Sequence, residues 1–187
     1  MNNTKEQLIL AGLEEINTHG IAGFSTRRVA KNCNISCAAP YKHFKDTDDF
    51  ISEILGYIND MYISEQQLVL EKYKDCSSRE RLIKVSLHYI RFLVENPEFR
   101  RVIMQNYNNC DEKYRCLRGR LSSQTYDLVS EYCRDVNMSD EARSRKTFMI
   151  RSIIYGSALF FDNNEMEYNE ENMQMVCDML NREFDLP

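Results

Sequence analysis

Apolar residues recur every three or four positions along most of the chain, which is the spacing of one face of an α-helix. Between residues 4 and 19, Leu8, Leu13 and Ile16 fall on one such face. Comparable patterns span residues 46–61, 79–95, 97–107, 111–135, 140–161 and 169–184. No stretch alternates apolar and polar residues as a β-strand does. The pattern therefore predicts an all-α protein, with about nine helices once two short ones in residues 26–44 are included.

Helix-ending and helix-capping residues define those two short helices. Gly20 follows the first long helix as a stop signal, and Ser25 is an N-cap residue directly before "TRRVAKNC". Asn34 tolerates the left-handed backbone that ends a helix. Ser36 is expected to cap the next short helix, "CAAPYKHF". A longer helix is expected to begin near Asp46 and to run without interruption into the second part of the chain.

Two short helices joined by "NIS" form a helix-turn-helix pattern, whose second helix reads base edges in the DNA major groove. Ala38 and Ala39 are small enough for this helix to approach the bases and to contact thymine methyl groups. Tyr41, Lys42 and His43 are placed to contact the flanking phosphates.

The charge distribution agrees with a nucleic-acid partner, although the net charge is −5. The segment 24–45 holds five basic residues and no acidic residue, whereas the segment from residue 163 onward holds seven acidic residues and one basic residue. A local basic patch on an acidic body is typical of a polyanion-binding module joined to a second part. A solvated helical face is the alternative interpretation of the same charges.

The run "GIAGFSTRRVAKNCNISCAAPYKHFKDTDDF", preceded by an amphipathic helix, resembles the TetR family of bacterial transcription regulators (TetR/AcrR-like). The resemblance covers roughly residues 5–55. It implies a three-helix DNA-binding domain at residues 1–50, joined by a long helix to a helical ligand-binding and dimerisation domain at residues 51–187. Such proteins are usually homodimeric repressors that bind a palindromic operator on double-stranded DNA and release it when a small-molecule inducer binds.

The resemblance and the pattern together assign the DNA-binding residues. Ser25 is the cap near a phosphate, Arg27 reads a base, and Cys37 lies at the exposed start of the recognition helix. The full set is Ser25, Thr26, Arg27, Arg28, Ser36, Cys37, Ala38, Ala39, Tyr41, Lys42, His43, Lys45 and Thr47.

The chain departs from the family pattern at four positions. Asn34 replaces a common Gly, and Thr47 replaces a common Lys, so that Lys45 is the substitute for one phosphate contact. Arg28 stands where an acid is common, which adds to the positive field. Pro40 falls about one turn into the recognition helix, where it removes a backbone hydrogen bond and predicts a short, irregular helix.

Several of these residues have a plainer interpretation that the sequence leaves open. Tyr41 can pack in a core, and His43 can be a helix C-terminal cation without a DNA role. Cys33 and Cys37 are either structural thiols or redox sensors, because a helix start lowers the pKa of a thiol.

The C-terminal part contains many aromatic residues on faces that are expected to share an interior. The expected inducer pocket is lined by Tyr89, Phe92, Met104, Tyr107, Tyr126, Phe148, Arg151 and Tyr155. Arg151 is the one basic residue in its apolar run, so it faces solvent, pairs with an internal acid, or holds a ligand carboxylate or phosphate. Packing of the aromatic residues as ordinary core is the alternative.

The segments 140–161 and 169–184 carry more apolar residues than one side of a helix can bury. Ile153, Leu159 and Phe160 are distributed around the first of them. By the family resemblance, the two helices are expected to pair with those of a second copy as a four-helix bundle. Burial within one chain is the alternative.

Other functional classes lack support in the sequence. We find no nucleophile elbow, P-loop, Rossmann glycine pattern or zinc-ligand spacing, so neither an enzyme nor a metal or other cofactor is predicted. No apolar run is long enough to span a membrane, and no secretory signal is evident. Seven cysteines without paired spacing favour a reducing, cytoplasmic location. The sequence therefore predicts a ligand-responsive repressor; the alternative is a DNA-binding regulator without a small ligand, controlled by a protein partner or by cysteine redox.

Overall fold

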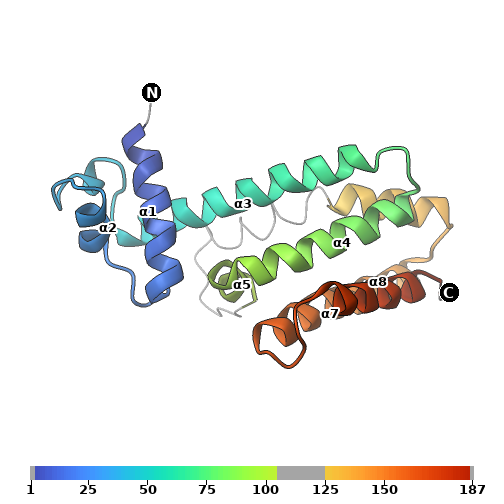
Figure 1. Ribbon diagram of the computed structural model, residues 1–187. Coiled ribbons are helices and arrows are strands. Elements are labelled where there is room, and N and C mark those ends of the chain that lie inside the picture. The colour runs from blue at the N-terminus through green and yellow to red at the C-terminus, as the bar shows by residue number, and fades with distance from the viewer. Residues whose placement is uncertain (1–2, 105–124, 186–187) are drawn as a thin grey trace. The chain divides into compact units, whose positions relative to one another are not determined.

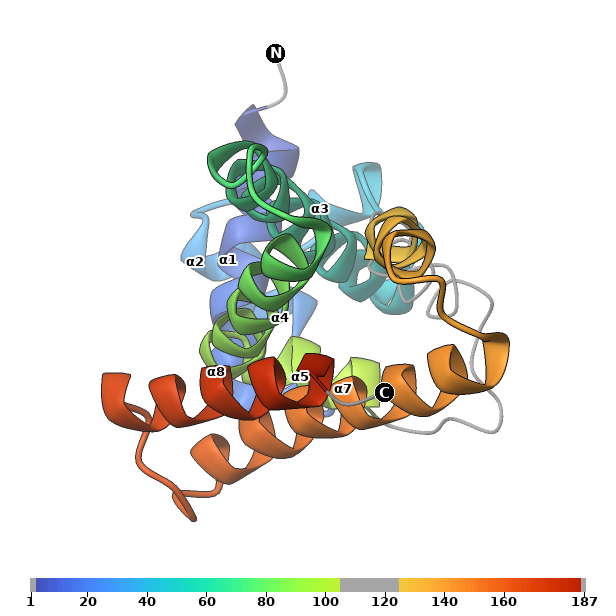
Figure 2. The same ribbon diagram turned by 90° about the vertical axis from the view of Figure 1, so that its right-hand side faces the viewer.

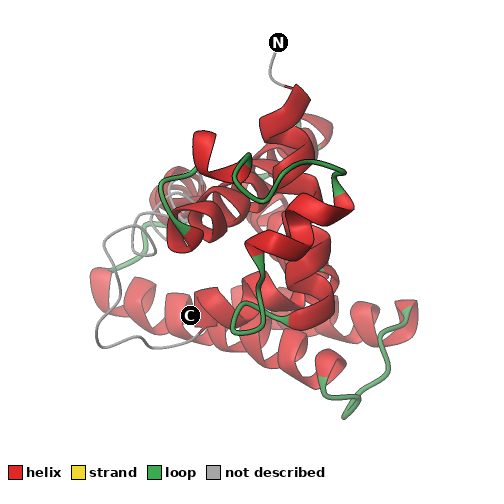
Figure 3. Cartoon of the chain, turned by 90° about the vertical axis from the view of Figure 1, so that its left-hand side faces the viewer, coloured by secondary structure: helices red, strands yellow, loops and turns green. Residues whose placement is uncertain are grey.

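A computed structural model describes residues 3–104 and 125–185 of the chain, with side chains for residues 4–100 and 125–185. Every regular element in these ranges is a helix (Figures 1 and 3). This confirms the all-α fold class. The predicted helix that begins at Asp111, and the predicted end of its predecessor near Tyr107, lie outside the described residues.

The helices are bounded close to the predicted positions. They are α1 (Asn3–His19), α2 (Thr26–Asn32), the 3-10 helix η1 (Pro40–Lys42), α3 (Thr47–Lys72), α4 (Ser78–Glu95), α5 (Pro97–Met104), α7 (Asp140–Asp162) and α8 (Glu170–Asp185). Residues 125–135 are also helical.

The chain forms two compact units, and the long helix α3 belongs to both. The first unit comprises Met1–Met61 and Pro97–Arg118, and the second comprises Tyr62–Asn96 and Gly119–Pro187. The division within α3 agrees with a boundary inside one long helix. The domain limits 1–50 and 51–187 remain a prediction.

The first unit has its core where α1, α2 and the beginning of α3 meet. The Phe44 ring stacks on Phe50 with centroids 3.9 Å apart, and Phe24 meets the same ring edge-on at 5.3 Å. At Gly12 of α1, an added Cβ would lie 2.6 Å from Ile54 of α3, so glycine permits the close approach of the two helices. Phe44, which ends the recognition segment, is thus fixed in the core.

In the second unit, α4 packs against α7 and α8, which run antiparallel and side by side (Figure 2). Their shared core contains Leu82, Ile90, Leu93, Ile154, Ala158, Phe161, Val176 and Leu180. Leu180 and Ala158 are fully buried within this one chain.

The predicted caps at Asn96, Pro97 and Ser139 are confirmed. Ser139 begins α7 and accepts a hydrogen bond from the Ala142 amide at 3.2 Å. Asn96 ends α4, and Pro97 opens α5 at the position where its missing N–H costs nothing. In the part of the chain that the structure describes, no helix is long and apolar enough to cross a membrane.

Candidate nucleic-acid interface

Two glycines set the connection from α1 to α2. Gly20 has φ of +69°, the left-handed conformation that ends α1 as predicted. A Cβ at Gly23 would lie 2.4 Å from the His19 carbonyl oxygen, so this turn excludes a side chain there. Ser25 then caps α2, with its hydroxyl accepting from the Arg28 amide at 3.4 Å.

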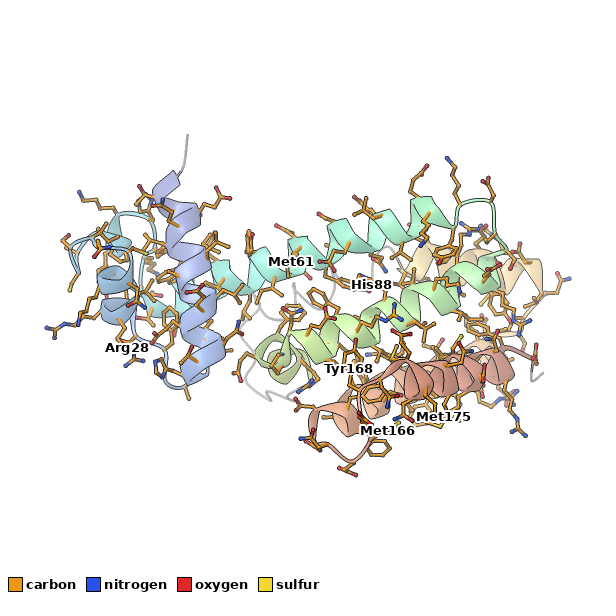
Figure 4. All side chains as sticks on the ribbon, in the orientation of Figure 1. Arg28, Met61, His88, Met166, Tyr168 and Met175 are labelled. Carbon is orange, nitrogen blue, oxygen red and sulfur yellow. The ribbon has the colours of Figure 1, made fainter. Side chains whose placement is uncertain are left out.

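A buried carboxylate holds the start of α2 to α1. Glu15 of α1 is 4% exposed, and its Oε1 accepts from the Ser25 amide at 3.2 Å and from Arg28 Nε at 2.7 Å. The same guanidinium donates to the Gly23 carbonyl, and Figure 4 shows Arg28 beside α1. Arg28 is therefore engaged inside the domain, and Glu15 offsets its charge.

Asn34 ends α2 in a Schellman motif. Its φ is +56°, the Ile35 amide donates to the Ala30 carbonyl at 3.0 Å, and the Asn34 amide donates to the Lys31 carbonyl at 3.0 Å. Asparagine thus performs the role for which Gly is common, as the sequence predicted.

The recognition segment differs from the predicted helix over residues 37–44. Residues 37–39 form a turn, and only Pro40–Lys42 is helical, with 3-10 geometry. The prediction that Ser36 caps a helix is wrong: its carbonyl accepts from the Ala39 amide at 2.9 Å, and the 3-10 helix has no side-chain cap. Because Pro40 is the first residue of this helix, its missing N–H leaves no hydrogen bond unmade.

The recognition segment presents small residues first and then polar ones. Cys37 and Ala38 are exposed and Ala39 is half-buried, whereas Pro40 packs inward. Tyr41 is 54% exposed, and Lys42 and His43 are exposed as well. The exposed Tyr41 ring does not form part of the core.

Four of the five basic residues of this region are available to an anion. Arg27, Lys31, Lys42 and Lys45 are exposed, and among the described residues no carboxylate lies within salt-bridge distance of their side chains. The fifth is Arg28, which is bound to Glu15.

The remaining predicted DNA contacts lie at the starts of α2 and α3 or in the loops that precede η1 and α3. The Thr26 hydroxyl is 3.3 Å from the Thr47 hydroxyl, which links the first turns of α2 and α3. Thr26 is buried, Ser25 and Thr47 are half-buried, and Ser36 is exposed. Lys45 is held by its amide, which donates to the Asp49 carboxylate at 3.0 Å, so its side chain extends from a fixed backbone.

Cys33 does not have the surroundings of a reactive thiol. Its Sγ lies 3.8 Å from the Gln7 carbonyl oxygen, to which it donates. Burial, and then the nearby Glu14 carboxylate, raise the pKa of the Cys33 thiol. A raised pKa lowers the thiolate fraction, which disfavours redox sensing at this residue.

Of the residues predicted to line a ligand pocket, the structure brings three together in the second unit. The Tyr89 ring lies 6.3 Å from that of Tyr155, while Tyr62 lies 5.1 Å from Tyr89 and 4.9 Å from Phe92. Burial, and then the neighbouring Tyr155, raise the pKa of Tyr89. We name Tyr62, Tyr89, Phe92 and Tyr155 the aromatic cluster.

The other predicted pocket residues lie outside the aromatic cluster, with Arg151 at its edge. Phe148 is 70% exposed, and Tyr126 is 60% exposed with the Arg143 guanidinium over its ring. Arg151 is exposed, with its guanidinium 5.7 Å from the centre of the Tyr155 ring. The Met104 side chain and Tyr107 fall outside the described part of the chain.

Sequence reasoning missed three residues of the same interior. Tyr62 is 2% exposed and belongs to the aromatic cluster, and the Gln66 amide, 1% exposed, donates to Thr125 at 3.0 Å. Figure 4 shows His88 on the side of α4 that faces α3, where its ring stacks on Tyr62. Tyr62 follows Ile58 by four residues, so continuing the apolar face of α3 by one turn would have identified it.

Residues 8–54 match the family model for bacterial regulatory proteins of the tetR family. The chain carries a tetR-family DNA-binding domain. The match covers most of α1, all of α2 and η1, and the first turns of α3, which are the elements that position the exposed cations. The protein is thus a DNA-binding regulator of tetR type.

One similar sequence extends well beyond this domain. The nucleoid occlusion factor SlmA of Sodalis glossinidius is 28% identical over 158 residues, which cover 84% of this chain and 77% of that protein.

Solved structures share the whole fold at lower identity. A TetR/AcrR-family regulator from Thermobifida fusca aligns with a TM-score of 0.70, at 18% identity, over 96% of this chain and 97% of its own. FadR from Bacillus subtilis, solved in complex with stearoyl-CoA, aligns with a TM-score of 0.66 and 16% identity. The alignment covers 97% of this chain and 96% of the FadR chain.

Proposed function

We propose that the protein is a homodimeric transcriptional repressor that binds a palindromic operator and releases it when a small-molecule inducer binds. The observation that carries the DNA half of this proposal is the set of four exposed cations, Arg27, Lys31, Lys42 and Lys45, around a short recognition segment; none has a carboxylate partner among the described residues. The cations supply sequence-independent phosphate contacts, and the small side chains of Ala38 and Ala39 let the backbone approach base edges.

The need for sequence specificity supports a dimer. The recognition segment is only a turn and a three-residue 3-10 helix, so one copy reads few bases. A twofold dimer presents two such segments to an inverted repeat.

Exposed apolar residues on α7 and α8 support the dimer interface. On α7, Phe148 is 70%, Phe160 47% and Leu159 39% exposed, and on α8 Met175 and Met179 are 42% and 46% exposed. Gly156 lies between Phe148 and Phe160, and an added Cβ there would meet no atom within 4 Å. A second copy of the two helices can therefore approach this face closely and bury it.

The aromatic cluster is the proposed centre of the inducer site. It combines large apolar side chains with buried polar groups, namely the tyrosine hydroxyls and the Gln66 side-chain oxygen, which has no hydrogen-bond partner among the described residues. Binding sites for small molecules combine these features. The likeness to FadR, a fold relative solved with stearoyl-CoA, is compatible with an apolar ligand.

A second candidate function rests on the similarity to SlmA, because the aligned region covers 84% of this chain and so includes most of the C-terminal part. In this case the protein would act in nucleoid occlusion, and its DNA sites would be spread over the chromosome. Control by a protein partner would then replace control by an inducer.

Selection of genomic DNA fragments by the purified protein tests both candidates. A repressor should enrich a few fragments that share an inverted repeat near promoters. Many dispersed sites would favour nucleoid occlusion instead. Enrichment of no sequence would contradict both candidates.

A further inference from the structure

A pocket of about 320 Å³ lies within the second unit, beside the aromatic cluster, since one of its lining residues, His88, stacks on Tyr62. The end of α3 contributes Val69, Lys72 and Tyr73, α4 contributes Lys84, Leu87, His88 and Arg91, and α8 contributes Glu170, Met173, Gln174 and Cys177. Its volume falls at the lower end of the range of about 300–1,000 Å³ found for small-molecule sites.

The pocket wall carries more positive than negative charge. Lys72, Lys84 and Arg91 contribute cations, and Glu170 is the one carboxylate among the lining residues. Glu170 is 93% exposed and lies 3.8 Å from Arg91, so water screens this pair. The whole protein has a net charge of −5, so the positive pocket is a local exception on an acidic protein.

Two of the cations gather at one end of the pocket around a single ring. The ammonium groups of Lys72 and Lys84 lie 5.4 Å and 5.3 Å from the centre of the Tyr73 ring. Within the described ranges, neither has a carboxylate within salt-bridge distance, whereas the neighbouring Lys74 is paired with Glu71 at 2.6 Å. Both ammonium groups thus lie near the same ring, and they make this end of the pocket positive.

The remaining wall is apolar. Met173 is 4% exposed and belongs to the core of the second unit, and Val69, Leu87 and Cys177 pack against that core. Burial lowers the pKa of His88, which disfavours a positive charge on its imidazole. Along α4, Lys84, Leu87 and Arg91 occupy one stripe of the helix, so the apolar floor continues directly from the cationic end.

We propose that this pocket binds a small amphipathic anion, a carboxylate or phosphate monoester on a short apolar chain. The anionic group lies between Lys72 and Lys84, and the chain lies over Leu87 and Met173. The proposal is independent of DNA binding and of the aromatic cluster, since it uses no residue of either.

Isothermal titration calorimetry of the full chain with octanoate and octyl phosphate tests the proposal, and 1-octanol and octylammonium serve as uncharged and cationic controls. Both anions should bind, and both controls should bind at least tenfold more weakly. Preference for octyl phosphate or for octanoate identifies which head group the lysines favour. Absence of binding by both anions at millimolar concentration, or equal binding of octylammonium, would overturn the proposal.

Charge-removing variants locate the site. The double variant Lys72→Met/Lys84→Met keeps the apolar part of each side chain but removes both charges. It should weaken anion binding at least tenfold. Lys74→Met removes a cation from the same chain region outside the pocket and should leave binding unchanged. Equal binding by the double variant and the wild type would contradict the placement of the anion.

A second measurement does not depend on the stability of those variants. In wild-type protein with ¹³C-labelled methionine methyl groups, octanoate should shift the Met173 resonance, which Met173→Leu assigns. The Met149 resonance, from a 40% exposed side chain of α7 that does not line the pocket, should stay in place. A shift of Met149 without a shift of Met173 would place the ligand elsewhere.

Discussion

The Arg28 guanidinium forms an ion pair with the buried Glu15 carboxylate, although the preceding residue, Arg27, has no such partner among the described residues. The two adjacent arginines therefore have different roles. Arg28 connects α2 to α1, whereas Arg27 remains available to DNA.

Arg28→Met should destabilise the protein, because it leaves the Glu15 carboxylate buried without its main partner. Since Arg28 is 47% exposed, the expected loss in the free energy of unfolding is about 1–2 kcal/mol rather than the larger values of fully buried pairs. Arg27→Met is the matched control and should change stability by less than about 0.5 kcal/mol. Urea denaturation measures both, and equal stability of the two variants would contradict the structural role of Arg28.

Placing a carboxylate on the exposed face of α7 should dissociate the dimer. Phe148→Glu and Phe160→Glu each place a charge in the proposed interface, and each should give monomers in light scattering while the helical circular dichroism is retained. Leu68→Glu makes the same kind of change at a 72% exposed site on α3 and should leave the dimer intact. Dimers in all three variants would place the interface elsewhere.

Which helical faces are exposed could not be derived from the sequence. The pattern correctly predicted helices 140–161 and 169–184 within one or two residues. It did not distinguish Phe161, which is 4% exposed, from Phe160, which is 47% exposed, because apolar residues surround this helix. Only the packing of α7 on α4 and α8 decides between them.

The candidate DNA site was predictable where local rules determine the backbone. The Gly20 stop, the Ser25 cap and the left-handed Asn34 all follow from residue type. The Glu15–Arg28 pair was not predictable, since it joins residues thirteen positions apart through the packing of two helices. The length of the recognition helix was overestimated because the pattern does not show that Pro40 begins a 3-10 helix.

Acid should destabilise the second unit through His88. Burial, the largest effect, lowers the pKa of this imidazole; the Glu95 carboxylate opposes the shift and the Arg91 guanidinium adds to it. The Glu65 carboxylate lies 3.5 Å away, but it is 44% exposed, so water screens its charge. The unfolded state therefore binds a proton more readily than the folded state, and stability falls as the pH drops below the ordinary histidine pKa of about 6.5. Above that pH the effect vanishes.

His88→Gln tests this prediction by removing the titrating group. The difference in unfolding free energy between pH 7.5 and pH 5 should be smaller in the variant than in the wild type. A His19→Gln variant controls for histidine loss at an exposed site. An unchanged pH dependence in His88→Gln would show that other groups cause the acid sensitivity.

Ala38 and Lys42 should affect DNA recognition differently. Ala38→Leu adds bulk where the exposed start of the recognition segment approaches the bases, so it should change which sequences are enriched from a pool of random duplexes. Lys42→Ala should weaken binding to all sequences alike, because a phosphate contact carries no sequence information. The reverse result would mean that the segment is oriented differently on the groove.

The salt dependence of operator binding tests the DNA-binding account most directly. With about four phosphate contacts from each of two subunits, the logarithm of affinity should fall with the logarithm of salt concentration at a slope near −7. Loss of one lysine per subunit in Lys42→Ala should reduce the slope by about 2, whereas Lys74→Ala, outside the DNA-binding region, should leave it unchanged. A wild-type slope near zero would contradict the account.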